Sequence, residues 1–193
     1  DHQYENLRNQ LSSLDLSVAL LVIEPGEKTK NWNSLKKTLE WLIKKEISKQ
    51  DYVVAFGGGV IGDLVGLAAS LLRRGVNLVQ IPTTLLAQVD SSIGGKTAIN
   101  SSEAKNVIGS FYQPKIVFCD SSFLQTLDRR QFLSGYSEIL KMAMVFDKKF
   151  FEYLDENWMS ILEQRQEQIK QVVTTSLKLK SMVVEKDEKE KDE

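Results

Sequence analysis

The sequence predicts an α/β protein whose N-terminal part is a doubly wound layer and whose C-terminal part is all helical. Up to about residue 128, short β-branched runs alternate with amphipathic stretches, as in a parallel sheet covered by helices. After Asp128 the chain has no strand pattern, no proline and a single glycine, Gly135. We therefore expect an α/β domain over residues 1–128 and the first part of a helical domain over residues 129–193.

Four apolar runs have the composition of buried parallel strands, because β-branched and large apolar side chains follow one another in them. They are residues 17–23, 52–56, 77–81 and 115–119.

The intervening segments have helical periodicity. Residues 32–47 place Leu35, Leu39, Leu42 and Ile43 on one face. Further helices are expected over residues 63–73, 129–144, 148–164 and 166 to about 185. The charged run that ends the chain is typical of a solvated helix end or a loop.

The charge balance excludes one class of partner. Lys and Arg number 25 against 26 Asp and Glu, so no positive excess is available to neutralise a nucleic acid backbone. No run approaches the ~20 apolar residues of a membrane span, and the polar start is not a signal peptide. The single cysteine, Cys119, lies in an apolar run and is expected to be a buried hydrophobe in a reducing compartment. We expect a cytoplasmic protein that binds neither nucleic acid nor membrane.

A glycine cluster follows the second predicted strand. Gly57-x-Gly59-x-x-Gly62 has the spacing of a dinucleotide-binding turn, in which backbone N–H groups at a helix N-terminus hold a pyrophosphate. Such folds also use an acidic residue about 20 positions later to hold the ribose. Here that place is taken by Pro82-Thr83-Thr84. The turn is therefore either structural or part of a different mode of nucleotide binding.

Polar residues crowd the next segment. IPTTLLAQVDSSIGGKTAIN, residues 81–100, holds two threonines, Asp90, a glycine pair, Lys96 and Asn100. Each alone is explained by a cap, a turn or a solvated side chain. Together, a carboxylate and an ammonium group beside a glycine-rich loop favour a hydroxylated, phosphorylated substrate.

The chain resembles the 3-dehydroquinate synthase family of sugar-phosphate cyclases over most of its length with few gaps, and six runs carry this resemblance. They are PGEKTK (25–30), GGGVIGDLVGLAAS (57–70), RRG (73–75), QIPTTLLAQVDSSIGGKTAIN (80–100), KNVIGSFYQPK (105–115) and GYSEILK (135–141).

This resemblance implies a Rossmann-like NAD-binding α/β domain with a parallel-rich sheet, then a helical domain that bears zinc or cobalt, with the active site between them. It also implies a reaction of the shikimate pathway, in which 3-deoxy-D-arabino-heptulosonate 7-phosphate is converted to 3-dehydroquinate and phosphate. In that chemistry NAD oxidises a substrate hydroxyl transiently and recovers its hydride, while the metal polarises the reacting oxygen.

The resemblance also assigns site residues. Those implied to contact NAD are Glu27, Lys30, Gly59, Val60, Ile61, Gly62, Asp63, Thr83, Thr84, Lys96, Lys105, Phe123, Leu124, Gln125 and Thr126. Those implied to serve the substrate are Asp90, Lys96, Lys141 and Lys180, together with Arg74, which reaches the phosphate from a neighbouring subunit and so implies a homodimer. Glu138 is the implied metal ligand.

One departure from the family pattern stands out. The family holds its metal with one glutamate and two histidines, whereas the only histidine here is His2. Catalytic zinc usually has three protein ligands. We therefore expect a partial chain that stops short of those histidines, lacks at least one strand at its start, and does not catalyse the full reaction alone.

Three other functions remain open on the sequence. A related cyclase making an inosose or a valiolone would share the NAD and metal contacts, and a metal-dependent polyol or alcohol dehydrogenase has a similar architecture but releases NADH. A non-catalytic nucleotide-binding module would explain the missing histidines without truncation.

Overall fold

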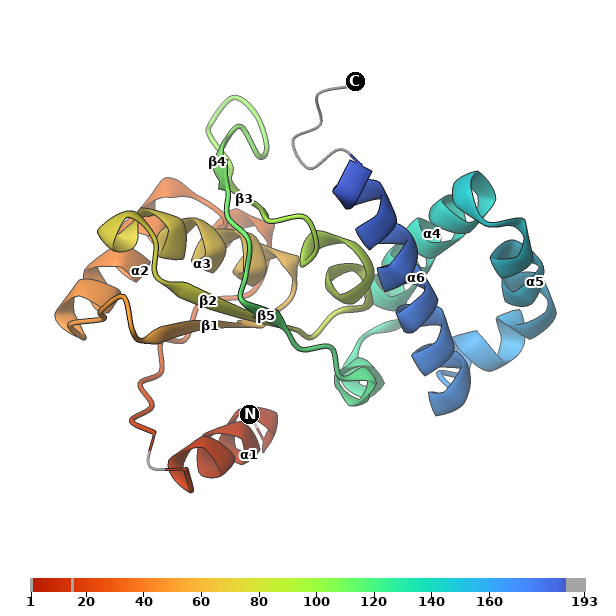
Figure 1. Ribbon diagram of the computed structural model, residues 1–193, viewed down its shortest axis with the longest axis horizontal. Helices are drawn as coiled ribbons and strands as arrows, with labels where there is room; N and C mark the ends of the chain where they lie inside the picture. Colours follow the sequence, from red (N-terminus) through yellow and green to blue (C-terminus); the bar gives the residue numbers. More distant parts are fainter. Residues whose placement is uncertain (1, 15, 187–193) are drawn as a thin grey trace.

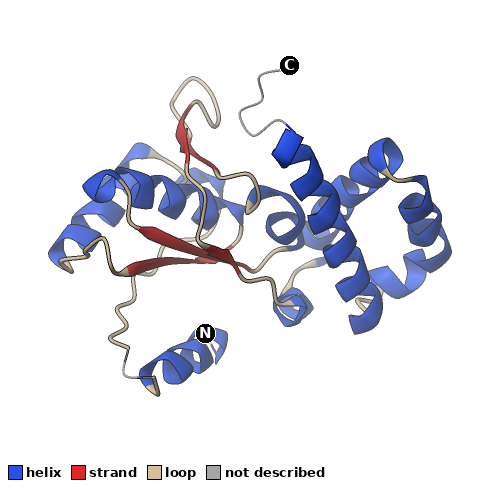
Figure 2. Cartoon of the chain, viewed as in Figure 1, coloured by secondary structure: helices blue, strands red, loops and turns tan. Residues whose placement is uncertain are grey.

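The computed structural model describes residues 2–14 and 16–186 and confirms the α/β fold class (Figure 1). A parallel sheet with its helices makes up one part of the molecule, and a group of three helices makes up the other (Figure 2). None of the helices in the described ranges has the length and apolar character needed to span a bilayer.

The main sheet has the order β1-β2-β5, all parallel. Strands β1 (Tyr52–Gly57) and β2 (Asn77–Pro82) confirm two of the predicted strands, and the third is reduced to β5 (Ile116–Val117). The register pairs Gly57 with Pro82, so both strands end at the same level. The turns that follow them therefore meet at one edge of the sheet.

The strand predicted over residues 17–23 is wrong. In the structure this segment is extended but belongs to no ladder among the described residues, and it follows helix α1 (His2–Ser12), which the sequence did not predict. An apolar run becomes a strand only where a neighbour offers matching N–H and C=O groups. Leu20 and Val22 consequently remain 48% and 76% exposed.

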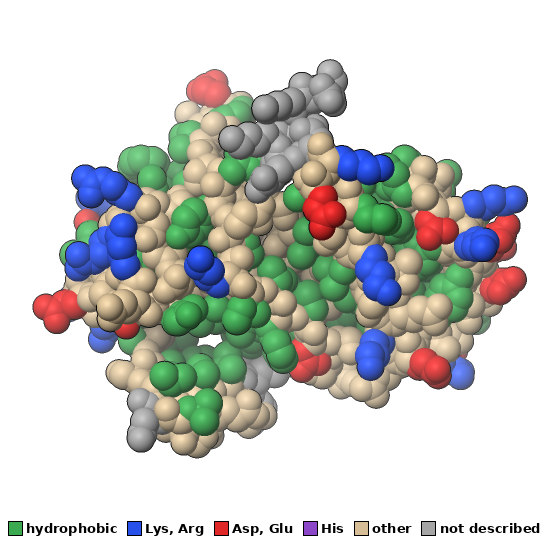
Figure 3. All heavy atoms as spheres, in the orientation of Figure 1, with side chains coloured by type: hydrophobic (Ala, Val, Ile, Leu, Met, Phe, Trp, Pro, Cys, Tyr) green, Lys and Arg blue, Asp and Glu red, His purple; other side chains and the backbone are tan. Residues whose placement is uncertain are grey.

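One face of the sheet is covered by a helix, on which a second helix packs. Helix α3 (Gly59–Leu71) starts earlier than predicted and is buried along its middle, while α2 (Trp32–Lys44) begins after its N-cap Asn31 and packs on α3. The opposite face of β1 exposes Tyr52 and Val54. Figure 3 shows hydrophobic side chains gathered on the lower side of this part, facing the region of α1.

A hairpin that the sequence did not predict rises beside α3 (Figure 1). Strands β3 (Lys96–Ile99) and β4 (Ile108–Phe111) pair antiparallel. Thr97 lies against Gly66 of α3, where a Cβ atom would come within 2.6 Å of the Thr97 methyl group. The absence of a side chain at Gly66 therefore allows the hairpin to pack closely on the helix.

The three helices predicted after Asp128 are confirmed. They are α4 (Arg129–Phe146), α5 (Lys148–Leu162) and α6 (Gln166–Lys186). Asp128 and Asp147 cap the first two, each accepting a hydrogen bond from a backbone N–H of the first turn. Residues 187–193 of the charged end lie outside the described residues. The division into two domains at residue 128 stays a prediction.

A short π-helical turn, η3 (Ala87–Ser91), connects the two parts. Leu85 and Val89 are fully buried in the same apolar cluster as the cores of α4, α5 and α6. A Cβ atom on Gly135 would lie 2.6 Å from the backbone nitrogen of Leu86. The one glycine of the helical part thus lets α4 pack directly against the backbone preceding η3.

Candidate active site

The glycine turn lies where the sheet strands end. Gly58 is the N-cap of α3 and, among the described residues, makes no side-chain cap hydrogen bond. The amides of Ile61 and Gly62 both donate to the Gly58 carbonyl, at 3.0 and 3.1 Å. The amides of Gly59 and Val60 precede the helix's own hydrogen-bonding pattern, and the helix dipole favours an anion beside them.

The polar segment after β2 packs against this turn. A Cβ atom on Gly58 would lie 3.0 Å from the Thr84 methyl group, and one on Gly59 would lie 2.9 Å from the Ser91 hydroxyl. The Thr83 amide donates to the Gly57 carbonyl at 2.9 Å. The structure therefore brings together the predicted glycine turn and the predicted threonine pair.

A buried ion pair stands beside the turn. Lys30 is only 4% exposed, and its ammonium group contacts the Asp63 carboxylate and the side-chain oxygen of Asn106. Burial raises the pKa of Asp63, although the hydrogen bond and charge of Lys30 act in the opposite direction. Lys30 and Asp63 were predicted, whereas Asn106 was not assigned a role. Its neighbour Lys105 was the only signal for it.

Asn100 connects the Glu27 turn to the hairpin. Its side-chain amide donates to the Glu27 carboxylate at 2.7 Å, and its backbone amide donates to the Lys30 carbonyl at 2.9 Å. Its side-chain oxygen accepts from the Asn106 amide at 3.0 Å. The sequence placed Asn100 in a polar segment but gave it no role, because a link across more than 70 residues leaves no local pattern.

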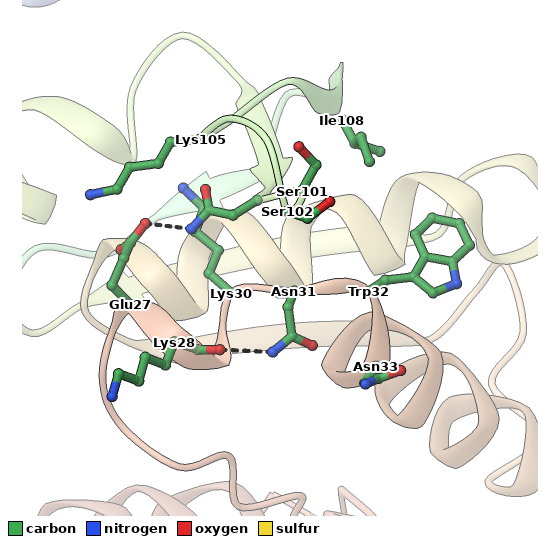
Figure 4. A pocket seen from close by; sticks show the side chains of 11 residues that line it. Glu27, Lys28, Lys30, Asn31, Trp32, Asn33, Ser101, Ser102, Lys105 and Ile108 are labelled. Atoms are coloured by element: carbon green, nitrogen blue, oxygen red, sulfur yellow. Dashed lines mark hydrogen bonds between the residues drawn. The ribbon is translucent and has the colours of Figure 1, made fainter.

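An open pocket of about 690 Å³ lies over these residues. In Figure 4, Glu27 and Lys105 lie near one end of it and Trp32 lies at the other. The remaining lining residues are Lys28, Lys30, Asn31, Asn33, Asn100, Ser101, Ser102 and Ile108. Three predicted cofactor residues, Glu27, Lys30 and Lys105, therefore share one concave surface.

The predicted segment 123–126 lies in the 3-10 helix η4 (Ser121–Thr126), after β5. The Phe123 ring meets the Phe56 ring edge to face with centroids 5.4 Å apart, which places η4 beside the end of β1. Leu124 is only 1% exposed and packs into the helical core, so a ligand can meet its backbone but not its side chain. Gln125 and Thr126 are exposed.

An ion pair joins the two parts of the molecule. Asp90 of η3 and Lys180 of α6 lie 2.7 Å apart, and each side chain is somewhat more than a quarter exposed. Both were predicted on the substrate side. The structure therefore brings them together at the junction, where a phosphate or carboxylate could exchange for the Asp90 carboxylate.

Glu138 and Lys141 form an ion pair one turn apart on α4. The Glu138 side chain is 22% exposed and that of Lys141 is 65% exposed. Within the described ranges no three His, Cys, Asp or Glu side chains come close enough to hold a metal ion. A single paired carboxylate does not supply the three ligands usual for catalytic zinc, so the described residues alone do not fit a metal.

Two further predicted residues lie on the periphery. Lys96 begins β3 with an exposed side chain. Arg74 follows α3 at the helix end opposite the glycine turn, and the structure does not bring it to the other site residues. Arg73, Arg74 and Gly75 all have positive φ, of 50°, 63° and 116°. This unusual turn leaves both arginines exposed.

Comparison with known proteins decides the family. A sequence model of the N-terminal part of 3-dehydroquinate synthase matches residues 20–134, and one of its C-terminal part matches residues 135–193. The chain belongs to the 3-dehydroquinate synthase family. Relatives with that name include those of Ruegeria sp. (strain TM1040), 46% identical over 96% of this chain, and Paracoccus denitrificans (strain Pd 1222), 46% identical over 97%. The chain spans about half the length of these curated relatives, 50% and 51%.

Solved structures of cyclases share the fold of this family member. The 2-epi-5-epi-valiolone synthase of Streptomyces hygroscopicus subsp. jinggangensis 5008, solved with NAD+ and Zn2+, superposes with a TM-score of 0.93 at 33% identity. The aligned region covers 97% of this chain and 53% of the valiolone synthase chain. A 2-deoxy-scyllo-inosose synthase, complexed with carbaglucose-6-phosphate, NAD+ and Co2+, superposes with a TM-score of 0.83 at 26% identity. The aligned region covers 98% of this chain and 52% of that chain. An iron-containing alcohol dehydrogenase of Thermotoga maritima, at 19% identity and a TM-score of 0.72, shares the fold alone.

Proposed function

We propose that the protein takes part in the 3-dehydroquinate synthase reaction, the conversion of 3-deoxy-D-arabino-heptulosonate 7-phosphate to 3-dehydroquinate and phosphate. Membership of the family supports this proposal. The observation that carries it is the convergence of the glycine turn, the threonine pair and the buried Lys30–Asp63 pair at one edge of the sheet. NAD and a divalent metal, zinc or cobalt, are the proposed cofactors.

The residues present fit a dinucleotide. The N-terminus of α3 has no side-chain cap hydrogen bond among the described residues, so no side chain uses the amides of its first turn as a cap. The Thr84 methyl group lies 3.0 Å from the place of a Cβ atom on Gly58, so a side chain there would crowd the turn. We propose that the pyrophosphate lies against the amides of Gly59 and Val60. We propose that Glu27, which accepts a hydrogen bond from Asn100, also accepts hydrogen bonds from the ribose hydroxyls.

When bound, NAD would accept and later return a hydride at a substrate carbon. The chain's own residues have positioning and electrostatic roles. We propose that Lys180, now held by Asp90, and Lys141, now held by Glu138, bind the substrate's phosphate and carboxylate, with Lys96 between substrate and cofactor. The carboxylates of Asp90 and Glu138 hold these two lysine side chains in place until the anionic groups of the substrate become their partners.

Glu138 is the proposed metal ligand of this chain, acting with ligands from outside the described residues. The proposal predicts weak zinc binding by the 193 residues and tight binding by the natural polypeptide that carries them. Calorimetric titration of zinc into both, with and without Glu138→Gln, tests it. Tight binding to the short chain that does not depend on Glu138 would contradict it.

The related cyclases are a second candidate function. The 33% identity and TM-score of 0.93 with a valiolone synthase favour it, because the shared contacts alone do not select the sugar phosphate. We further propose a cytoplasmic homodimer in which Arg74 contacts the phosphate bound by the other subunit. Sedimentation analysis of the natural polypeptide tests the dimer.

A product assay distinguishes these functions. The natural polypeptide is incubated with NAD, Zn²⁺ and the heptulosonate phosphate, and released phosphate, 3-dehydroquinate and NADH are measured. We expect equal amounts of phosphate and 3-dehydroquinate and no net NADH. Turnover of other sugar phosphates in its place would favour the second candidate, and net NADH would favour a dehydrogenase.

A further inference from the structure

A buried glutamine outside the predicted site links two of its walls. Gln88 lies in η3 and is 0% exposed. Its side-chain amide donates to two backbone carbonyls, that of Pro82 at 3.1 Å and that of Asp120 at 2.8 Å. These carbonyls are 38 positions apart in the sequence, 120 minus 82, so the side chain connects segments that are not neighbours in the chain.

Both carbonyls lie at the start of segments that carry proposed cofactor contacts. Pro82 ends β2 and is followed by Thr83 and Thr84. Asp120 is the N-cap of η4, which holds Phe123. Its carboxylate accepts the Ser122 amide at 2.8 Å, and its carbonyl also accepts the Phe123 amide at 3.3 Å. The glutamine amide thus reaches the segments that carry both sets of contacts.

The chemistry of the site favours an amide here for a purpose other than packing. The Gln88 side-chain oxygen is buried and has no hydrogen-bond partner among the described residues. A buried polar atom without a partner is unfavourable, and an apolar side chain of similar volume would avoid it. An apolar side chain would, however, remove the donor that joins the two carbonyls. The side chain therefore supplies hydrogen bonds to the two carbonyls, although this leaves its own oxygen buried without a partner among the described residues.

We infer that Gln88 is a positioning residue that sets the separation between the Thr83-Thr84 segment and η4, and so the width of the dinucleotide site. This inference rests on the proposed function, because it takes both segments as walls of an NAD site. Gln88 itself does not touch the ligand, since its amide is used by the two carbonyls and its side chain is fully buried.

Two substitutions separate the donor from the shape of the side chain. Gln88→Met keeps the length and volume and removes the amide, whereas Gln88→Glu keeps the shape and replaces the donor by an acceptor. Leu154→Ala, in the fully buried core of α5, is the control for a general loss of stability. NAD affinity is measured by calorimetry well below each protein's Tm, and amide hydrogen exchange is measured without ligand.

We expect both Gln88 variants to raise the Kd for NAD at least fivefold and to speed exchange of the Ser122 and Phe123 amides at least tenfold. Leu154→Ala should lower the Tm while leaving both quantities within twofold. If the Gln88→Met variant keeps its Kd and its exchange rates within twofold, or if Leu154→Ala shows equal changes, the inference is wrong.

The exchange measurement keeps this inference separate from the proposed function. If the unsubstituted protein does not bind NAD, the proposed function fails at that step. Faster exchange confined to residues 121–126 in the Gln88 variants would then still show the link between the segments, and unchanged exchange would overturn that link as well.

Discussion

Lys30 is held in the site by buried electrostatic contacts. Lys30 reaches Asp63 and Asn106 from a turn 33 positions before Asp63, and it is almost completely buried. A lysine so enclosed is rare unless it is paired. Its sequence context showed only that it matched a family motif. Its burial and its partners depend on the packing of three distant segments.

Replacing Lys30 tests this pair. Lys30→Met keeps the aliphatic volume but leaves the Asp63 carboxylate partly buried without its cation, so we expect the free energy of unfolding to fall by about 3 kcal/mol. Urea denaturation measures it, with the exposed Lys36→Met on α2 as the control. A change under about 1 kcal/mol would show that the pair contributes little.

The pH dependence follows from the raised pKa of Asp63. Because its folded-state pKa lies above the ordinary value of 3.8, the folded protein binds this proton more tightly, and stability falls as pH rises from 3.8 through the folded pKa. Without Lys30 the pKa rises further, so the Lys30→Met variant should lose stability over a wider range above pH 3.8.

Cys119 gives a further prediction at this scale. It is partly rather than fully buried, and burial raises its pKa to about 11 from an ordinary 9.0. The reactive thiolate is thus about 100-fold rarer at neutral pH than for an ordinary thiol. Alkylation followed by mass spectrometry at pH 8 should be slower by at least this factor than for glutathione. Comparable rates would contradict the described burial.

At the scale of elements, periodic segments were predictable and pairings were not. The sequence predicted the helices α2, α4, α5 and α6 and the strands β1 and β2, because each of these segments contains its own pattern of apolar residues. The run over residues 17–23 had the right composition for a strand but found no ladder among the described residues. The β3–β4 hairpin was missed because its strands are short and its polar residues were interpreted as a loop.

The candidate site shows the same division. The glycine turn, Thr84, Asp90 and Lys180 were named from sequence motifs, and the structure brings the turn to the threonines and Asp90 to Lys180. Asn100 and Gln88 were given no role, because Asn100 bonds to Glu27 73 positions away and Gln88 bonds to Asp120 32 positions away, and no spacing rule links them.

Gly135 tests the contact between elements. Alanine at an ordinary helix position stabilises relative to glycine by about 1 kcal/mol. Here its Cβ would lie 2.6 Å from the Leu86 nitrogen and 2.7 Å from the Leu85 Cβ, so we expect Gly135→Ala to destabilise by about 1–3 kcal/mol. Thermal and urea unfolding measure it, with the exposed Ser134→Ala on the same helix as the control. A stabilised Gly135→Ala variant would show that α4 does not approach so closely.

For the whole molecule, the junction at η3 makes the sheet and the helices one structure. Its contact is mainly apolar, since Leu85 and Val89 are buried in the helical core, while the Asp90–Lys180 pair is partly exposed. We expect Leu85→Ala to lower the free energy of unfolding by about 3 kcal/mol and Asp90→Asn to lower it by less than about 1 kcal/mol. Chemical denaturation compares the two, and the reverse order would show that the ion pair holds the parts together.

NAD binding by the protein and by its Gly59→Val variant tests the central claim most directly. Valine at this position would place a branched side chain beside the backbone amides of the turn. Its Cβ would meet the Ser91 hydroxyl at 2.9 Å, so Gly59→Val is also made together with Ser91→Ala to relieve that contact. Calorimetry should show NAD binding by the unsubstituted protein and by Ser91→Ala alone. Both proteins that carry Gly59→Val should keep their helix content by circular dichroism and lose NAD binding at least 100-fold. A folded Gly59→Val protein with unchanged NAD affinity would contradict the account.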